Sequence, residues 1–279
     1  MQQFRPTLFY SVPTLYAAML HETDEQNPYD VSSVRLGISA AEPLPPEIYQ
    51  RWKARFGFEI LDGIGSTEAL HIYASACPGE VKPGSTGHPV PGYDVRITDA
   101  QGNQVPAGEV GDLWVRGESI APCYWNRHQL SKQRMCGEWF FTGDKFSMDD
   151  DGYLWYAGRA DDMFRVSGQW ISPIEIENTL IEHAQVLEAA VVPFEDENQL
   201  LKPKAYVVLK DESGGRDELA SELQDFVKQR IAPYKYPRRV EFVAELPKTA
   251  AGKIQRHKLR MGGQDAAPEL DNAPLNQTT

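Results

Sequence analysis

From residue 34 onward the chain shows a strand period followed by a helical period. The apolar run VRLGI at 34–38 predicts a buried strand, and the small residues of Ser39–Glu42 predict a tight turn after it. A helix is expected from Pro45 and Pro46, because proline is tolerated in a first helical turn. One face of this helix repeats an apolar residue every four positions, at Ile48, Trp52 and Phe56.

A second strand is expected near 58–62 (FEILD), and it runs into the turn Gly63–Glu68. Strand, turn, helix and strand in this order are typical of an α/β sheet. Such sheets bind ligands at the carboxyl ends of their strands. The turns that follow the two strands are therefore candidate binding segments.

The pattern becomes β-rich between about residues 83 and 158, where short runs such as YDVRIT, GDLWVRG and GYLWYAG alternate with turns. Asp149–Gly152 fits a hairpin turn better than a Ca²⁺ loop, since the glutamate expected at the twelfth loop position is absent. Pro83–Gly87 lacks the lysine that follows a phosphate loop, so a structural turn is expected there.

A third pattern follows Arg159 and predicts a small α+β unit. Ser172–Glu175 has the sequence of a capping box, with proline at the first helical position, and predicts a helix to about His183. Two strands are expected next, LEAAVVP and KAYVVLK, and then an amphipathic helix from Asp217 to Ile231. The apolar face of that helix comprises Leu219, Leu223 and Phe226.

Charge and composition exclude several classes of function. The net charge is −12 and no basic stripe is present, which argues against nucleic acid and anionic membrane as partners. The three cysteines are widely spaced and predict reduced thiols rather than a disulfide framework or a zinc site. Neither a signal peptide nor an apolar run of about 20 residues is recognisable, so a cytoplasmic location is expected.

Five short segments carry candidate chemistry: SAAEPLP (39–45), DGIGSTE (62–68), FTGD (141–144), GRADDMFRVSGQWISP (158–173) and PKTAAGKIQR (247–256). Each alone is a weak signal. In this order and spacing they resemble the signatures of the adenylate-forming (AMP-binding) superfamily, which includes acyl-CoA synthetases, peptide-synthetase adenylation domains and firefly luciferase. PTLFYSVPTLYAAML and LPKTAAGKIQRHKLR are most similar to benzoate-CoA ligases and other aromatic acid-CoA ligases.

The resemblance implies an α/β fold with a defined domain order. Residues 1–158 would be the second half of the large N-terminal domain, an α/β sheet followed by a β-rich subdomain at about 83–158. Residues 159–261 would form the small, mobile α+β C-terminal domain. The tail at 262–279, rich in Gln, Asn, Pro and Ala, is expected to be disordered.

The activity that the resemblance implies is that of an ATP-dependent acid–CoA ligase. A carboxylic acid, here a benzoate-like aromatic acid, reacts with ATP to give an acyl-adenylate and pyrophosphate. A rotation of the C-terminal domain then lets coenzyme A attack, which releases acyl-CoA and AMP. ATP/AMP, Mg²⁺ and coenzyme A are the implied cofactors.

The resemblance also implies a role for each motif residue in nucleotide binding. Thr67 would bind phosphate, and Glu68 would hold Mg²⁺, a hard ion that prefers oxygen ligands. Asp144 would accept hydrogen bonds from both ribose hydroxyls, and Arg159 would also reach the ribose. Further nucleotide contacts are implied for Ala41, Glu42, Asp62 and Gly63.

Lys253 matches the lysine that enters the active site for adenylation, where its cation would stabilise developing charge. Asp161 matches the hinge residue of the small domain. Ser167 and Gly168 match the small residues that line the path of the pantetheine thiol. Arg165 stands where the family usually has lysine, and its bulkier guanidinium leaves the role of that position open.

For the acid pocket, the resemblance implies contacts with Ala40, Gly65, His71 and Ile72. The two small residues would leave room for a flat ring, and His71 would lie at its edge. The alternative is that His71 is an ordinary first-turn histidine and Ile72 a core residue. Ile64 stands where the family often has an aromatic residue against adenine, so apolar contact would replace stacking.

Relatives of this kind begin upstream with a Ser/Thr/Gly-rich loop ending in lysine, which is not found in these 279 residues. The expectation is that half of the large domain is missing, and that the chain alone is not a competent ligase. It would then pair with an N-terminal half or form a homo-oligomer through its exposed strand edges.

Alternative functions remain within and outside the superfamily. A medium-chain or other carboxylic acid–CoA ligase is the runner-up, and a luciferase-like enzyme or a peptide-synthetase domain is less favoured. From a different class, the chain would be a non-catalytic module that binds AMP without turning over.

Overall fold

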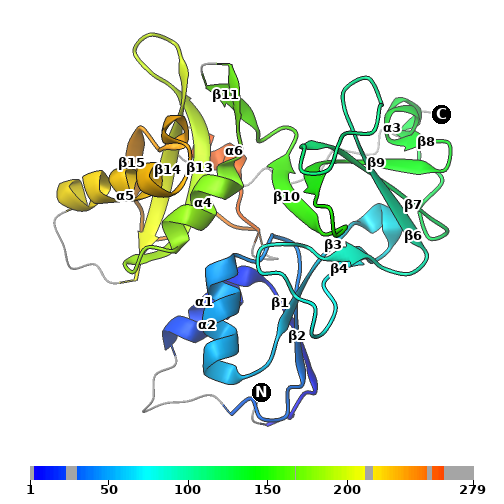
Figure 1. The fold of residues 1–279 in the computed structure, drawn as a ribbon, viewed down its shortest axis with the longest axis horizontal. Coiled ribbons are helices and arrows are strands. Elements are labelled where there is room, and N and C mark those ends of the chain that lie inside the picture. The colour runs from blue at the N-terminus through cyan, green and yellow to red at the C-terminus, as the bar shows by residue number, and fades with distance from the viewer. Residues whose placement is uncertain (1–2, 23–29, 167, 211–215, 250–252, 261–279) are drawn as a thin grey trace, which may run out of the picture.

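A computed structural model describes residues 3–22, 30–166, 168–210, 216–249 and 253–260. The predicted disordered tail at 262–279 lies outside this part of the chain. Figure 1 shows three masses that meet near the centre of the molecule: an α/β sheet, a β-rich sheet and a small α+β unit. The predicted succession of these three kinds of structure is confirmed.

The first mass contains a five-stranded sheet in the order β1–β2–β3–β4–β5 within the described residues. The strands are β1 (Leu8–Ser11), β2 (Leu36–Ser39), β3 (Ile60–Gly65), β4 (Ile72–Ser75) and β5 (His88–Pro89). The first three run parallel, and the last two are antiparallel. Ser11, Ser39 and Asp62 are neighbours in register, so polar side chains gather where the parallel strands end.

Two helices, α1 (Pro13–Glu22) and α2 (Pro46–Phe56), lie on one side of the parallel strands (Figure 1). As predicted, α2 has proline in its first turn, and Ile48 and Trp52 on its buried face. Trp52 is fully buried, with ring centroids 4.4–6.4 Å from those of its aromatic neighbours. Those neighbours are Phe9, Tyr16, Phe56 and Phe58. An aromatic cluster therefore fixes α2 on the sheet.

The second mass is an antiparallel sheet in the order β10–β9–β7–β6, with β8 paired to β9. Its strands are β6 (Tyr93–Thr98), β7 (Gly111–Gly117), β8 (Met135–Cys136), β9 (Trp139–Met148) and β10 (Leu154–Arg159). Inward residues of this sheet pack against β4, which joins the first two masses in one core. The turn Asp149–Gly152 connects β9 and β10, as predicted.

The third mass is a three-stranded sheet of β13 (Val186–Glu195), β14 (Leu201–Leu209) and β15 (Arg239–Phe242). Helices α4 (Pro173–Ile181) and α5 (Arg216–Arg230) pack on one face, and α6 (Arg256–Arg260) on the other. Alternate residues of β13 face opposite cores, and both faces are covered. A ribbon of β11 (Phe164–Val166) and β12 (Gln169–Ile171) precedes the sheet, and short 3₁₀ turns lie at Thr67–Ala69 and Pro233–Lys235.

Three local predictions differ from the structure. Strand β3 continues through Gly65, where a turn was expected from Gly63, because β4 pairs with it and supplies hydrogen bonds. Helix α3 (His128–Arg134) was not predicted, because none of its residues is buried and no apolar period marks it. Ser172 accepts the Glu175 N–H, but the Glu175 carboxylate pairs with Lys235 instead of closing the capping box.

Within the part of the chain that the structure describes, no helix has the length and apolarity needed to cross a bilayer.

We predict that Trp52→Ala lowers the stability of the first mass by about 3–5 kcal/mol, because it leaves a cavity among four aromatic rings. Calorimetric melting of the chain measures this loss. Trp52→Phe should cost less, since the indole N–H has no hydrogen-bond partner in the structure. Trp125→Ala is the matched control, because that side chain is 93% exposed. An equal drop in melting temperature for both alanine variants would contradict the prediction.

Candidate functional site

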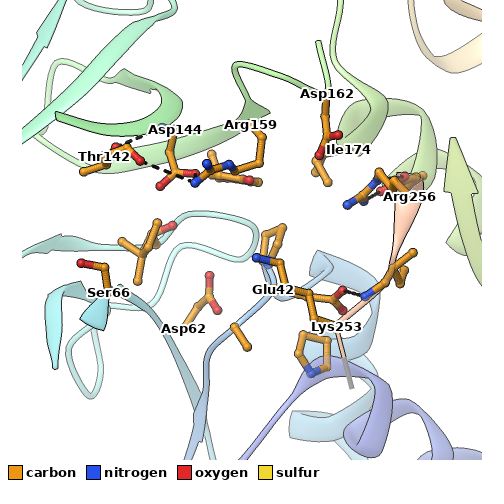
Figure 2. A pocket seen from close by; sticks show the side chains of 18 of the residues that line it. Glu42, Asp62, Ser66, Thr142, Asp144, Arg159, Asp162, Ile174, Lys253 and Arg256 are labelled. Carbon is orange, nitrogen blue, oxygen red and sulfur yellow. Dashed lines mark hydrogen bonds and ion pairs between the residues drawn. The ribbon is translucent and has the colours of Figure 1, made fainter. Parts of the chain in front are cut away.

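A cavity of about 820 Å³ lies where the three masses meet. It is lined by the turn after β2, the end of β3, the strands β9 and β10, and the segment around Lys253. Figure 2 shows side chains from these separate segments directed toward one another across the cavity. The structure thus brings together most of the residues that the motifs predicted: Ala41, Glu42, Asp62, Gly63, Gly65, Thr67, Glu68, Asp144, Arg159, Asp161 and Lys253.

Asp144, within β9, and Arg159, the last residue of β10, form an ion pair of 3.2 Å (Figure 2). They are directly opposed in the strand register, so the antiparallel pairing itself brings them together. Thr142 Oγ1 accepts the Asp144 N–H at 3.0 Å. Burial raises the pKa of Asp144, while the charges of Arg159 and Lys253 oppose that rise. The pair therefore presents carboxylate oxygens and a cation on one wall.

Glu68 lies in the short 3₁₀ turn after β3, opposite a loop of the β-rich sheet. Tyr124 donates its hydroxyl hydrogen to Glu68 Oε1 at 2.5 Å. Burial acts to raise the pKa of Glu68, but hydrogen bonds, this one among them, lower it below its usual value. For Tyr124, burial and the contact with Glu68 both act in one direction and raise its pKa to about 12. Glu68 is therefore held as a carboxylate in the cavity wall.

Asp62 is a buried carboxyl group within β3, beside Ser39 of β2 in the strand register. Its Oδ1 atom has no hydrogen-bond partner in the structure. Burial raises the pKa of Asp62 well above its usual range, although the backbone N–H groups of Leu44 and Gly63 oppose the rise. A buried acceptor without a partner is costly, so this oxygen is suited to a donor group brought by a ligand.

Lys253 comes from the far end of the chain and lines the same cavity (Figure 2). The next residue, Ile254, donates its backbone N–H to Glu42 Oε1 at 2.7 Å. This hydrogen bond joins the small unit to the turn after β2. The site is consequently assembled from segments about 210 residues apart in sequence.

The predicted acid-pocket residues are not assembled in the same way. Ala40, His71 and Ile72 are not among the residues that line this cavity. Gly65 does line it, but a Cβ on Gly65 would lie 2.3 Å from the His71 carbonyl oxygen. A bulge between β3 and β4 therefore requires glycine here, a structural reason that does not depend on a ring.

Of the two predicted coenzyme A residues, the structure describes Gly168. Gly168, exposed and with a φ of +82°, forms the tip of the β11–β12 ribbon and does not line the cavity. Ser167 lies outside the described residues. Arg165 stacks its guanidinium over the exposed Trp170 ring at 4.5 Å. Asp161 lies in the turn after β10, in which the Asp162 N–H donates to the Arg159 carbonyl.

The cavity residues that motif reasoning missed include Tyr124, Tyr156, Glu177 and Arg256. Arg256 and Glu177 form a buried ion pair of 2.7 Å. Tyr156 also lines the cavity, and burial raises the pKa of its hydroxyl group. A charged Glu177 on the apolar face of α4, between Ile174 and Ile181, was a usable signal. The Tyr124 contact to Glu68 had no signal, because 56 residues separate the two.

Two family models match the chain. The family model for the AMP-binding enzyme matches residues 1–125, and the model for the AMP-binding enzyme C-terminal domain matches residues 175–253. The chain is 51% identical over 261 residues to benzoate--CoA ligase of Thauera aromatica, across 93% of this chain and 49% of that protein. It is 44% identical to 4-hydroxybenzoate--CoA/benzoate--CoA ligase of Rhodopseudomonas palustris, across 97% of this chain and 51% of the relative.

A solved structure shows the same arrangement. The anthranilate CoA ligase AuaEII in complex with anthranoyl-AMP superposes with a TM-score of 0.89 at 49% identity. The match covers 93% of this chain and 50% of the other. The chain thus spans about half the length of the relatives that it matches.

We predict that Asp62→Asn stabilises the chain more at pH 8 than at pH 5. Because burial raises the folded pKa of Asp62, the folded state holds a proton that the unfolded state has released. The free energy of unfolding of the unsubstituted chain therefore falls as the pH rises from the unfolded-state pKa of Asp62 to its higher folded-state pKa. Each kcal/mol recovered raises the melting temperature by about 2–4 °C. Asp150→Asn, an exposed turn residue, is the control. A gain independent of pH would contradict the prediction.

Proposed function

Because the chain belongs to the AMP-binding enzymes, we propose that it supplies the nucleotide-binding and lysine-bearing half of an ATP-dependent aromatic acid–CoA ligase. The reaction would join a carboxylate to the AMP group of ATP with loss of pyrophosphate. The thiol of coenzyme A would then displace AMP to give the thioester. One observation supports this most directly: Asp144, Glu68 and Lys253, from three separate segments, line one cavity.

The nucleoside would bind along the wall made by β3, β9 and β10. Asp144 has carboxylate oxygens for two neighbouring ribose hydroxyls, and Arg159 holds it in place from 3.2 Å. The unpartnered Oδ1 of Asp62 suits an amino group of the base. The backbone at Ala41 and Gly63 lies close enough to the cavity to border a flat ring.

The phosphates would lie near the 3₁₀ turn after β3. Thr67 offers a hydroxyl to a phosphate oxygen, and Glu68 offers a carboxylate to Mg²⁺. No cluster of three or more metal-ligating side chains occurs among the described residues, which fits an ion held by one carboxylate and substrate phosphates. Bound Mg²⁺ would neutralise charge on the pyrophosphate leaving group.

Lys253 would provide the cation that the first half-reaction requires. It lines the cavity, and its positive charge acts to lower the pKa of the Asp144 carboxyl group. A positioned cation beside the attacking carboxylate and the α-phosphate stabilises the charge that develops between them. Roles for Asp161 as a hinge, and for Ser167 and Gly168 beside coenzyme A, are part of the same proposal.

The aromatic substrate class is supported by the names of the relatives, which are ligases of benzoate, 4-hydroxybenzoate and anthranilate. Ala40, Gly65, His71 and Ile72 stay the proposed pocket residues, with the rest of the pocket contributed by segments beyond this chain. A location in the cytoplasm belongs to the same proposal.

The first test uses this chain fused to the upstream half of the Thauera aromatica ligase. Lys253→Ala should lower benzoate-dependent pyrophosphate exchange by about 10²–10³, yet leave thioester formation from supplied benzoyl-adenylate largely intact. Lys258→Ala is the matched control, because Lys258 does not line the cavity. Equal losses in both half-reactions would refute the role of Lys253, and a fusion that binds AMP without any exchange would indicate a non-catalytic module.

A second test addresses the acid. In the same fusion, benzoate should exceed hexanoate in kcat/KM, because a slot bordered by small residues favours a flat ring over a flexible chain. A panel of ring-substituted benzoates and straight-chain acids measures the preference. Higher kcat/KM for the aliphatic acids would favour a medium-chain acid–CoA ligase instead.

A further inference from the structure

Residues 247–249 and 253–255, the latter carrying Lys253, pair antiparallel as the two arms of a hairpin. Thr249 N–H donates to the Lys253 carbonyl at 2.8 Å, and Gln255 N–H donates to the Pro247 carbonyl at 2.8 Å. These two bonds flank an antiparallel bridge between Lys248 and Ile254. In such a pair the two opposed residues direct their own N–H and C=O groups away from each other. The Ile254 N–H therefore points out of the hairpin.

Glu42, in the turn after β2, accepts a hydrogen bond from this N–H group. Its Oε1 lies 2.7 Å from the Ile254 nitrogen, as the dashed line beside Glu42 in Figure 2 shows. The preceding residue, Ala41, has a φ of +78°, a left-handed conformation that a side chain rarely adopts. This tight turn after β2 carries the chain from the strand end to the Glu42 position. Backbone strain of this kind recurs at functional sites.

The charges around Glu42 favour the same contact. Arg256 and Lys248, both on the small unit, attract its carboxylate, while Glu177 repels it. Burial raises the pKa of Glu42, and the Ile254 N–H is the strongest influence that opposes the rise. The other arm of the hairpin is held separately, since Lys248, which lies opposite Ile254 in the bridge, pairs with Glu188 of β13 at 2.7 Å. Glu42 thus holds the edge of the hairpin that adjoins Lys253.

We propose that Glu42 is a positioning residue that docks the Lys253 hairpin against the turn after β2, and so holds the lysine in the cavity for adenylation. This inference rests on the proposed function for its catalytic meaning, but the docking itself is a property of the fold. The carboxylate touches neither the substrate acid nor its reacting atoms in this proposal. It acts through the backbone of Ile254, and a charge-assisted hydrogen bond of this type is among the stronger ones in proteins.

Hydrogen exchange tests the docking without any assay of activity. In the 279-residue chain, the Ile254 amide should be protected, and Glu42→Ala should raise its exchange rate about 10-fold or more. Glu42→Gln, whose amide oxygen still accepts, should restore part of the protection. Amides within α5, packed in a separate core, report that the variants remain folded. Glu47→Ala, in the first turn of α2, is the matched control. Unchanged exchange at Ile254 in Glu42→Ala would overturn the proposal.

Kinetics in the fused ligase test the catalytic consequence. Glu42→Ala should slow benzoyl-adenylate formation about 10- to 100-fold and leave thioester formation from supplied benzoyl-adenylate within about 2-fold, with Glu42→Gln between Glu42→Ala and wild type. Equal slowing of both half-reactions would overturn the positioning role. If the wild-type fusion forms no adenylate at all, the proposed function fails, and the exchange measurement still decides whether Glu42 docks the hairpin.

Discussion

The ion pair between Asp144 and Arg159 is the contact on which the rest of the site depends. It joins the last residue of β10 to β9, directly before the chain passes into the small unit. Asp144 is buried and Arg159 is partly exposed, so the carboxylate depends on this guanidinium for much of its charge compensation. The pairing of β9 with β10 places these two residues opposite each other. The same pairing therefore fixes the wall of the cavity and the position at which the chain leaves β10 for the small unit.

Burial gives the cavity its electrostatic character. It raises the pKa of three carboxyl groups, those of Glu42, Asp62 and Asp144, whereas hydrogen bonding keeps that of Glu68 low. In a medium of low effective dielectric constant, each nearby donor or cation has a larger effect than it would in water. The chain has a net charge of −12, and several of its acidic groups line this cavity. Cations and N–H donors from other segments, such as Arg159 and the Ile254 amide, contact these groups.

Much of the fold was predictable from local patterns, because each depends on short-range physics. The four-residue apolar repeat and the two prolines predicted α2, and the run LEAAVVP predicted the strand that the structure shows as β13. The end of β3 was not predictable, since Gly63 and Gly65 suggest a turn until β4 supplies partners for them. Helix α3 also escaped prediction, because it buries no residue and so shows no apolar period.

The residue types in the motifs determined the chemistry that we propose for the site: carboxylates for hydroxyls and Mg²⁺, glycines for close backbone approach, and a lysine for developing charge. Only the tertiary structure decided which of them meet. Asp144, Glu68 and Lys253 converge, whereas His71 and Ile72 do not line the same cavity. The Glu42–Ile254 hydrogen bond spans 212 residues, and no local pattern encodes a contact of that range. Such contacts follow from the packing of whole sheets, which single-sequence periodicity does not specify.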